Sequence, residues 1–92
     1  MINRKQARYI VKQKLPETMD IVDKHTVEKD YGWVFFAQTK KYIRSEEITH
    51  IAIGFGGTLV EKTTGKIYKF GSVFSLEENL KIYELGYLKY DS

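Results

Sequence analysis

The sequence predicts an α+β fold, because a helical pattern lies near each end of the chain and strand patterns lie between them. Both helical patterns begin at a capping box, and the region between them holds a five-residue apolar run and a Thr-Gly hairpin signal. The chain has 92 residues, of which 42% are hydrophobic and 29% charged, which is the length and balance of one domain with a modest core. We therefore expect a single domain over residues 1–92.

The first helix is predicted to begin after Asn3, a capping residue that has Gln6 three positions further on. Pro16 ends it, because the residue before a proline disfavours helical angles. Apolar residues recur at helical spacing, namely Ala7, Ile10, Val11 and, beside Lys14, Leu15. The other side of the helix carries five basic residues, namely Arg4, Lys5, Arg8, Lys12 and Lys14, and residues 1–15 contain no acid. We expect this side to be a solvated face.

Two strands are predicted next. Residues 20–29 mix apolar and polar side chains without a helical period, which indicates an edge strand, and Asp30-Tyr31-Gly32 is a turn signal. The run from Trp33 to Ala37 is too short for a helix and rich in aromatic and β-branched residues. It predicts a central strand that is buried on both faces, with Trp33 in the core.

Residues 42–57 carry no consistent pattern. Ser45-Glu46-Glu47 is typical of the start of a short helix, Ile51-Ala52-Ile53 of a strand fragment, and the glycines of Gly54-Phe55-Gly56-Gly57 interrupt either element. We expect a long connection with little regular structure.

The final third of the chain predicts a hairpin and a helix. Residues 58–63 and 66–70 are the two expected strands, and they flank Thr64-Gly65, where glycine supplies the positive φ that a tight turn or a bulge requires. A tight turn and a bulge give different pairings of Leu59 with the second strand, and the sequence does not decide between them. Gly71 ends the second strand. Ser75 and Glu78 then form a capping box, which predicts a helix over residues 76–85 that ends at Gly86.

Composition and motifs exclude most catalytic classes. The chain has no cysteine, and its two histidines, His25 and His50, lie in no metal-binding spacing. The acids near His25 alternate faces on a strand, so we expect no metal. Gly54-x-Gly56-Gly57 is similar to part of a phosphate-binding loop, but the full pattern requires glycine at the position of Leu59. We expect no cofactor, no small-molecule ligand and no enzymatic activity.

Charge and hydropathy limit the partners. The net charge of +3 comes from the basic first segment, whereas a nucleic-acid-binding protein spreads Lys and Arg over a wider face with aromatic residues between them. No apolar run approaches the roughly 20 residues of a membrane span, and the first residues lead into charge rather than into the apolar core of a signal peptide. These patterns argue against nucleic acid and membrane partners, and we expect a cytoplasmic location.

Several segments occur in an order and spacing that together form a pattern. They are Gly32-Trp33-Val34-Phe35, then Leu59-Val60-Glu61-Lys62-Thr63-Thr64-Gly65-Lys66-Ile67, then Gly71, then the helix from Leu76-Glu77-Glu78 to Tyr83, preceded by an N-terminal helix with Ala7. In these features the sequence resembles the immunity protein 35 family, also called YrhB-like, of bacterial toxin-immunity systems. It departs from that family at Gly57 and Ser75, where relatives often have proline.

The resemblance implies a helix packed on an antiparallel sheet of about four strands, with a C-terminal helix. It also implies an immunity protein that binds and neutralises a cognate bacterial toxin by occluding its active site, a papain-like peptidase being one such toxin. Some YrhB-like proteins are described as chaperone-like, so a chaperone-like stress protein is the alternative. A small basic nucleic-acid-binding protein is the third hypothesis.

The toxin-binding site is predicted in the stretch 42–57, because recognition usually lies in loops on a rigid scaffold and an aromatic or Arg residue often dominates the binding energy. The candidate contact residues are Tyr42, Arg44, Glu46, Glu47, His50 and Phe55. Phe55, between two glycines, either projects into a cleft of the toxin or packs on the core beneath the loop.

Overall fold

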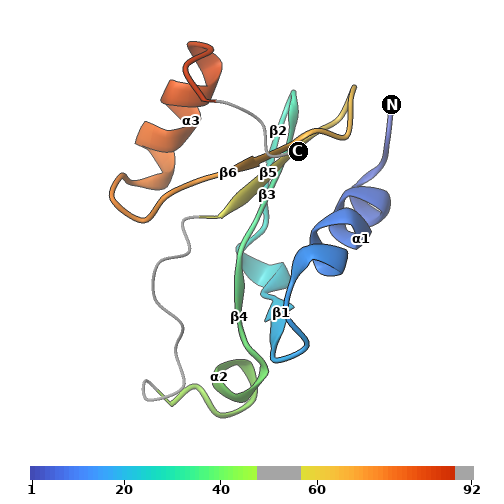
Figure 1. Ribbon diagram of the computed structural model, residues 1–92, viewed down its shortest axis with the longest axis vertical. Coiled ribbons are helices and arrows are strands. Elements are labelled where there is room, and N and C mark those ends of the chain that lie inside the picture. Colours follow the sequence, from blue (N-terminus) through green and yellow to red (C-terminus); the bar gives the residue numbers. More distant parts are fainter. Residues whose placement is uncertain (48–56, 89–92) are drawn as a thin grey trace.

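The computed structural model describes residues 1–47 and 57–88 and confirms the α+β fold (Figure 1). Its elements follow one another as α1 (Arg4–Lys14), β1 (Met19–Ile21), a 3₁₀ helix (Asp23–His25), β2 (Val27–Lys29), β3 (Gly32–Phe35), β4 (Ala37–Thr39), α2 (Lys40–Ser45), β5 (Thr58–Glu61), β6 (Ile67–Lys69) and α3 (Leu76–Glu84). Strands β2, β3, β5 and β6 form an antiparallel sheet in that order, and β1 pairs with β4 in a separate two-stranded sheet.

The two expected strands of the first half each divide in two. The expected edge strand over 20–29 is wrong as one element, because β1 and β2 belong to different sheets and the 3₁₀ helix separates them. The expected central strand holds for β3, which is buried along its whole length, but the chain leaves the sheet at Phe36. There the Phe36 carbonyl accepts a hydrogen bond of 2.7 Å from the backbone of Val22, and β4 continues to pair with β1.

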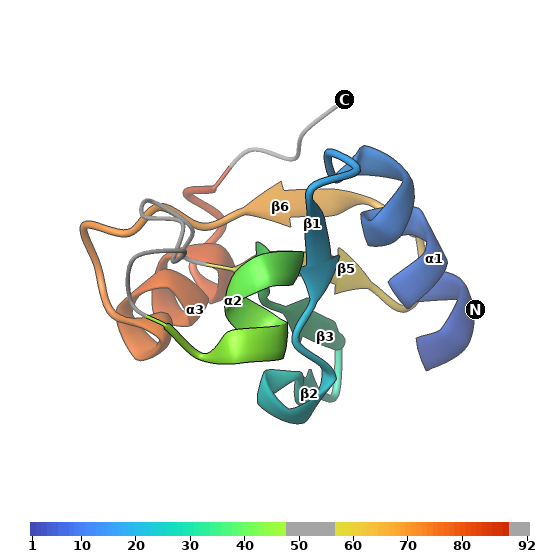
Figure 2. The same cartoon turned by 90° about the horizontal axis from the view of Figure 1, so that it is seen from below.

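The four-stranded sheet lies between two helices, with α1 on one face and α3 on the other (Figures 1 and 2). Successive strand residues point to opposite faces, so each face collects alternate side chains. The α1 face is a cluster of Ala7, Val11, Ile21, Trp33, Phe35, Val60 and Ile67. The α3 face is a cluster of Val34, Leu59, Phe70 and Leu80. Trp33 is 4% exposed, as predicted for a core residue.

Both predicted capping boxes are present. The Asn3 side chain accepts from the backbone of Gln6, and the Gln6 side chain accepts from the backbone of Asn3. Ser75 and Glu78 make the same reciprocal pair at the start of α3. Each box satisfies backbone N–H groups that a helix end leaves without a partner, so these short local patterns fix where the helices begin.

The predicted hairpin is also confirmed, and its register is now defined. Leu59 lies opposite Tyr68, and Thr58 lies opposite Lys69. The turn closes through Gly65, whose φ is +72° and whose N–H donates to the Glu61 carbonyl at 2.9 Å. A left-handed φ strains most L residues, so glycine is required at this position.

Tyrosine side chains make ring contacts and hydrogen bonds between α3 and the sheet side of the molecule. The Tyr83 ring centroid lies 5.0 Å from that of Tyr31 and 4.8 Å from that of Tyr68. The Tyr83 hydroxyl donates to the Glu61 carboxylate at 2.5 Å, and the Tyr31 hydroxyl donates to Glu84. Burial raises the pKa of both phenols, and their carboxylate partners raise it further.

Candidate functional site

A groove of about 840 Å³ lies between α2, the segment 21–27, β4 and the start of α3. We call it the α2 groove. Its apolar lining residues are Ile21, Val22, Val27, Phe36, Ala37, Ile43 and Leu76, and its polar lining residues are Asp23, Lys24, His25, Gln38, Tyr42 and Glu46. Most of the apolar members are buried or half-buried, whereas Asp23, Lys24, His25 and Glu46 are exposed. The groove therefore has an apolar floor and a mainly polar rim.

Helix α2 forms one wall of this groove and corrects the expectation of an irregular connection from residue 42. It begins at Thr39, whose hydroxyl accepts from the backbone of Tyr42 at 3.1 Å. It ends at Glu46, whose φ of +58° is left-handed. Ser45 and Glu46 thus terminate a helix, although the sequence pattern suggested that a helix would start there. The remainder of the predicted connection, residues 48–56, lies outside the described residues.

The residues predicted from sequence to bind the partner fall into three groups. Tyr42 and Glu46 line the α2 groove. Arg44 and Glu47 are exposed and are not part of its lining. The other two, His50 and Phe55, lie outside the described residues. The structure therefore brings two of the six side chains together in one concave surface.

Most of the floor was not anticipated as part of a site. Val27 is the first residue of β2, Phe36 lies between β3 and β4, and Leu76 comes from the first turn of α3. Their apolar character was visible in the sequence, but it fits an ordinary core equally well. Only the division of the strands brings these three residues beside α2.

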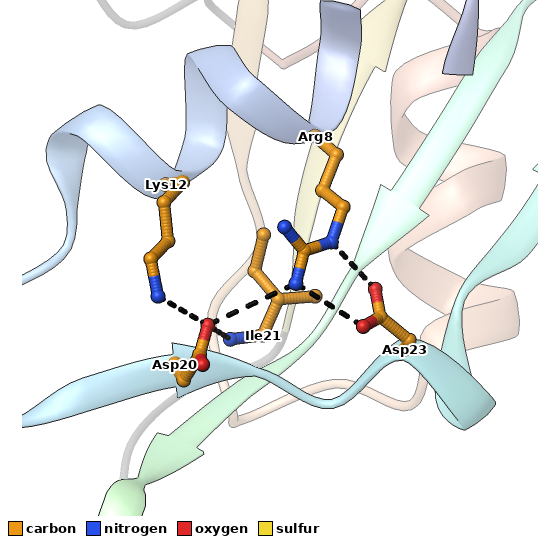
Figure 3. Close-up of polar contacts among 5 residues, drawn as sticks. All are labelled: Arg8, Lys12, Asp20, Ile21 and Asp23. Carbon is orange, nitrogen blue, oxygen red and sulfur yellow. Dashed lines mark hydrogen bonds and ion pairs between the residues drawn. The ribbon is translucent and has the colours of Figure 1, made fainter. Parts of the chain in front are cut away.

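The opposite wall, around residues 20–25, is fixed to α1 by a cluster of charged side chains (Figure 3). Arg8 makes two parallel hydrogen bonds to the Asp23 carboxylate, from Nε at 2.7 Å and from Nη2 at 3.1 Å. Lys12 Nζ lies 2.5 Å from Asp20 Oδ1, which also accepts from the backbone of Ile21 at 2.7 Å. A two-point contact of this kind restrains direction as well as distance, so it orients the 3₁₀ helix at the rim of the groove.

This cluster also corrects the expectation that the basic face of α1 is simply solvated. The side chains of Arg8 and Lys12 are only 37% and 35% exposed, and they pair with Asp23 and Asp20 respectively. The hydrogen bond from Lys12 holds the pKa of Asp20 below its ordinary value, and the Ile21 N–H and the charge of Arg8 act in the same direction. Two of the five basic residues near the N-terminus are therefore engaged within the protein.

No family model, curated protein or solved structure matches the chain. The geometry of the site is therefore the basis for assigning a role.

The groove combines an apolar floor with a mainly polar rim. In residues 1–47 and 57–88, no group of three or more His, Asp and Glu side chains is arranged to hold a metal ion. The described helices include none that is long and apolar enough to cross a bilayer. A partly buried tyrosine beside an apolar floor, with charges at the rim, is the arrangement by which protein surfaces hold an inserted side chain or loop.

Proposed function

We propose that the protein is a cytoplasmic immunity protein that binds a cognate bacterial toxin and neutralises it by occluding its active site, without catalytic activity of its own. The α2 groove is the surface proposed to contact the toxin. One observation carries this proposal, which is the presence of Tyr42 and Ile43 on one short helix beside an apolar floor and a charged rim. The resemblance to the immunity protein 35 family agrees with it, and a papain-like peptidase is the toxin class that the resemblance suggests.

The walls of the groove support this role because both are held in place before any partner arrives. The cap at Thr39 and the left-handed end at Glu46 define α2, and the pair between Arg8 and Asp23 orients the opposite rim. A preformed surface loses little conformational entropy when it binds, so more of its contact energy becomes affinity.

Two alternatives make different predictions. A chaperone-like stress protein would suppress aggregation of unrelated unfolded proteins and would need no toxin gene beside its own. A nucleic-acid-binding protein would show an affinity that falls steeply with salt. The engagement of Arg8 and Lys12 with acids within the protein favours neither alternative, and it reduces the basic surface available to the second.

The direct test uses the product of the open reading frame adjacent to this gene. That product is expected to stop growth when expressed alone and to be tolerated when it is coexpressed with this protein. Affinity is then measured by calorimetry for Tyr42→Ala and for Arg44→Ala, a matched control on the same helix whose side chain does not line the groove. We expect Tyr42→Ala to weaken binding at least about tenfold, or ~1.4 kcal/mol, and the control to change it little.

Normal toxin binding by the Tyr42→Ala variant would show that the α2 groove is not the contact surface. If Tyr42→Ala binds normally while charge reversal at Arg4 and Lys5 abolishes binding, the basic helix is the contact surface. Phe55→Ala belongs in the same series, because a loss of affinity there with an unchanged melting temperature would support the sequence-based prediction that Phe55 enters the toxin cleft. If the neighbouring product is harmless and does not bind, the proposed function is wrong.

A further inference from the structure

A second cavity lies where the strands divide. Strands β3 and β5 are paired as far as Phe35 and Thr58, and beyond this pair the chain turns away into β4. A cavity of about 460 Å³ is bounded by this division, by the last turn of α1 and by β6. We call it the split-sheet cavity. Its volume is within the range of about 300–1,000 Å³ that is usual for sites that bind small molecules.

The floor of this cavity is apolar and belongs to the buried core. Val11, Phe35, Ile67 and Phe70 all line it, and each side chain is at most 4% exposed. These residues come from α1, from two strands of the sheet and from the residue after β6. An apolar hollow of this kind hydrates poorly, so an aliphatic chain that enters it gains about fourfold in affinity for each methylene group removed from water.

The charge of the cavity has one sign. Its lining includes Lys14 and Lys69 and no acidic residue among the residues that the structure describes. Lys14 is exposed at the end of α1, where a long side chain keeps its ammonium group in water beside the apolar wall. A ligand that complements this lining has an apolar body and one negative charge at its exposed end.

We propose that the split-sheet cavity binds an apolar chain that carries a single carboxylate, in the size range of a medium-chain fatty acid. The chain lies against Val11, Phe35 and Ile67, and the carboxylate pairs with Lys14. This inference is independent of the α2 groove and of the proposed function, because the two lining sets share only Ala37.

The test is a titration of the ¹⁵N-labelled full-length protein with sodium decanoate below its micelle concentration, followed by amide chemical shifts and by calorimetry. Decanoate is expected to shift amides near Leu15, Thr58 and Gly71, with one ligand bound per chain. Octanoate, which is two methylene groups shorter, is expected to bind about tenfold more weakly. Decyltrimethylammonium, with the same chain length and the opposite charge, is expected to bind more weakly than decanoate.

Two matched pairs of variants locate the ligand. Lys14→Glu is expected to weaken decanoate binding about fivefold or more, and Lys5→Glu, on the same helix but outside the lining, is expected to leave it unchanged. Thr58 is half-buried in the lining, so Thr58→Phe places a large side chain in the cavity and is expected to abolish decanoate binding. Thr63→Phe, in the exposed turn, is expected to leave decanoate binding unchanged. If Thr58→Phe does not fold, Gly71→Leu takes its place as the variant that fills the cavity. Gly71 also lines the cavity, and a Cβ added there meets no atom within 4 Å, so the substitution is expected to leave the fold intact.

Four results would overturn the inference, of which the first three concern the specificity and place of binding. These three are equal affinity for decanoate and decyltrimethylammonium, equal effects of Lys14→Glu and Lys5→Glu, and shifts that map to the α2 groove. An absence of decanoate binding to the folded wild-type protein would do the same.

Discussion

The two faces of the sheet hold their helices by different polar contacts. On the α1 side, Arg8 pairs with Asp23 of the 3₁₀ helix and Lys12 pairs with Asp20 of β1, in addition to the apolar cluster that α1 shares with the sheet. On the α3 face, phenol hydroxyls donate to carboxylates beside tilted and edge-on ring contacts, as Tyr83 does to Glu61. Both faces have a similar apolar alternation, so the difference lies in the chemistry that surrounds each cluster.

This difference predicts different responses to salt and pH. Partly exposed ion pairs contribute at most about 1 kcal/mol each and are screened by salt, so their main effect is to orient the wall of the α2 groove. A phenol that donates to a carboxylate needs its proton and does not depend on a second charged group. The α3 face is therefore expected to tolerate salt and to weaken at high pH.

The largest effect is expected for Trp33→Ala, which removes the aromatic centre of the α1 face. Trp33 is 4% exposed, and Lys62 Nζ lies 5.1 Å from its ring centroid. The loss of its packing should cost about 3–5 kcal/mol of unfolding free energy, measured by urea denaturation. Tyr87→Ala, at a position that is 79% exposed, is the control and should change stability by less than about 0.5 kcal/mol. Native tryptophan fluorescence that is already red-shifted and freely quenched would contradict the burial of Trp33.

High pH should loosen the α3 face selectively. The pKa values of Tyr31 and Tyr83 are raised above their ordinary value of 10.0, first by burial and then by Glu84 and Glu61 respectively. The folded protein therefore retains protons that the unfolded chain releases, so the stability from these groups is complete below pH 10 and falls as the pH rises above it. Between pH 9 and 11 the wild type should lose more stability than the double variant Tyr31→Phe/Tyr83→Phe. Equal losses in the two proteins would exclude the phenols as the cause.

Tyr83→Phe alone tests the strength of one phenol contact at neutral pH. It removes the hydroxyl that donates to Glu61 but leaves the ring and another donor to that carboxylate, Thr64. The expected cost is about 1 kcal/mol of unfolding free energy. Tyr9→Phe, at an exposed position, should change nothing. Comparable effects of the two substitutions would mean that the contact with Glu61 contributes no stability.

Arg8→Ala should have a smaller effect, because the pair with Asp23 is partly exposed. We expect a loss below about 1 kcal/mol in low salt that shrinks further in 1 M NaCl. Lys5→Ala provides the control on the same helix. A loss that does not depend on salt would show that Arg8 acts through packing of its aliphatic stem and not through its charge.

The smallest effect is expected at the end of α2. Glu46 holds a left-handed φ of +58°, which costs a non-glycine residue about 1–2 kcal/mol, whereas glycine has an entropic cost of about 0.5–1 kcal/mol. Glu46→Gly should therefore raise the unfolding free energy by about 0.5 kcal/mol. Glu47→Gly serves as the comparison, and an equal gain from it would contradict the assignment of strain to Glu46.

Local patterns account for the parts of the fold that the sequence predicted. The caps at Asn3 and Ser75 and the turn at Gly65 involve residues within a few positions of one another, so their signals can be read directly. The division of the strands at Phe36 depends on its contact with Val22, which lies fourteen positions earlier, and on the pairing of β1 with β4. An apolar run in the sequence does not indicate which other strand it will pair with.

The candidate site shows the same limit. Tyr42 and Glu46 were selected from sequence for lying in a stretch without a pattern, and the structure places both of them in the α2 groove. The rest of the groove needed the divided strands and the position of α3, which bring Val27 and Leu76 to the same surface. Helix α2 itself has six residues and a single side-chain cap at Thr39, too short for a periodic pattern to reveal.

The measurement that tests the central claim most directly is hydrogen–deuterium exchange of this protein, alone and in complex with the product of the adjacent open reading frame. The account predicts that binding slows exchange in segments 21–27 and 38–46, which form the two walls of the α2 groove, and leaves residues 4–14 unchanged. Protection confined to residues 4–14, with no change in the groove segments, would contradict it.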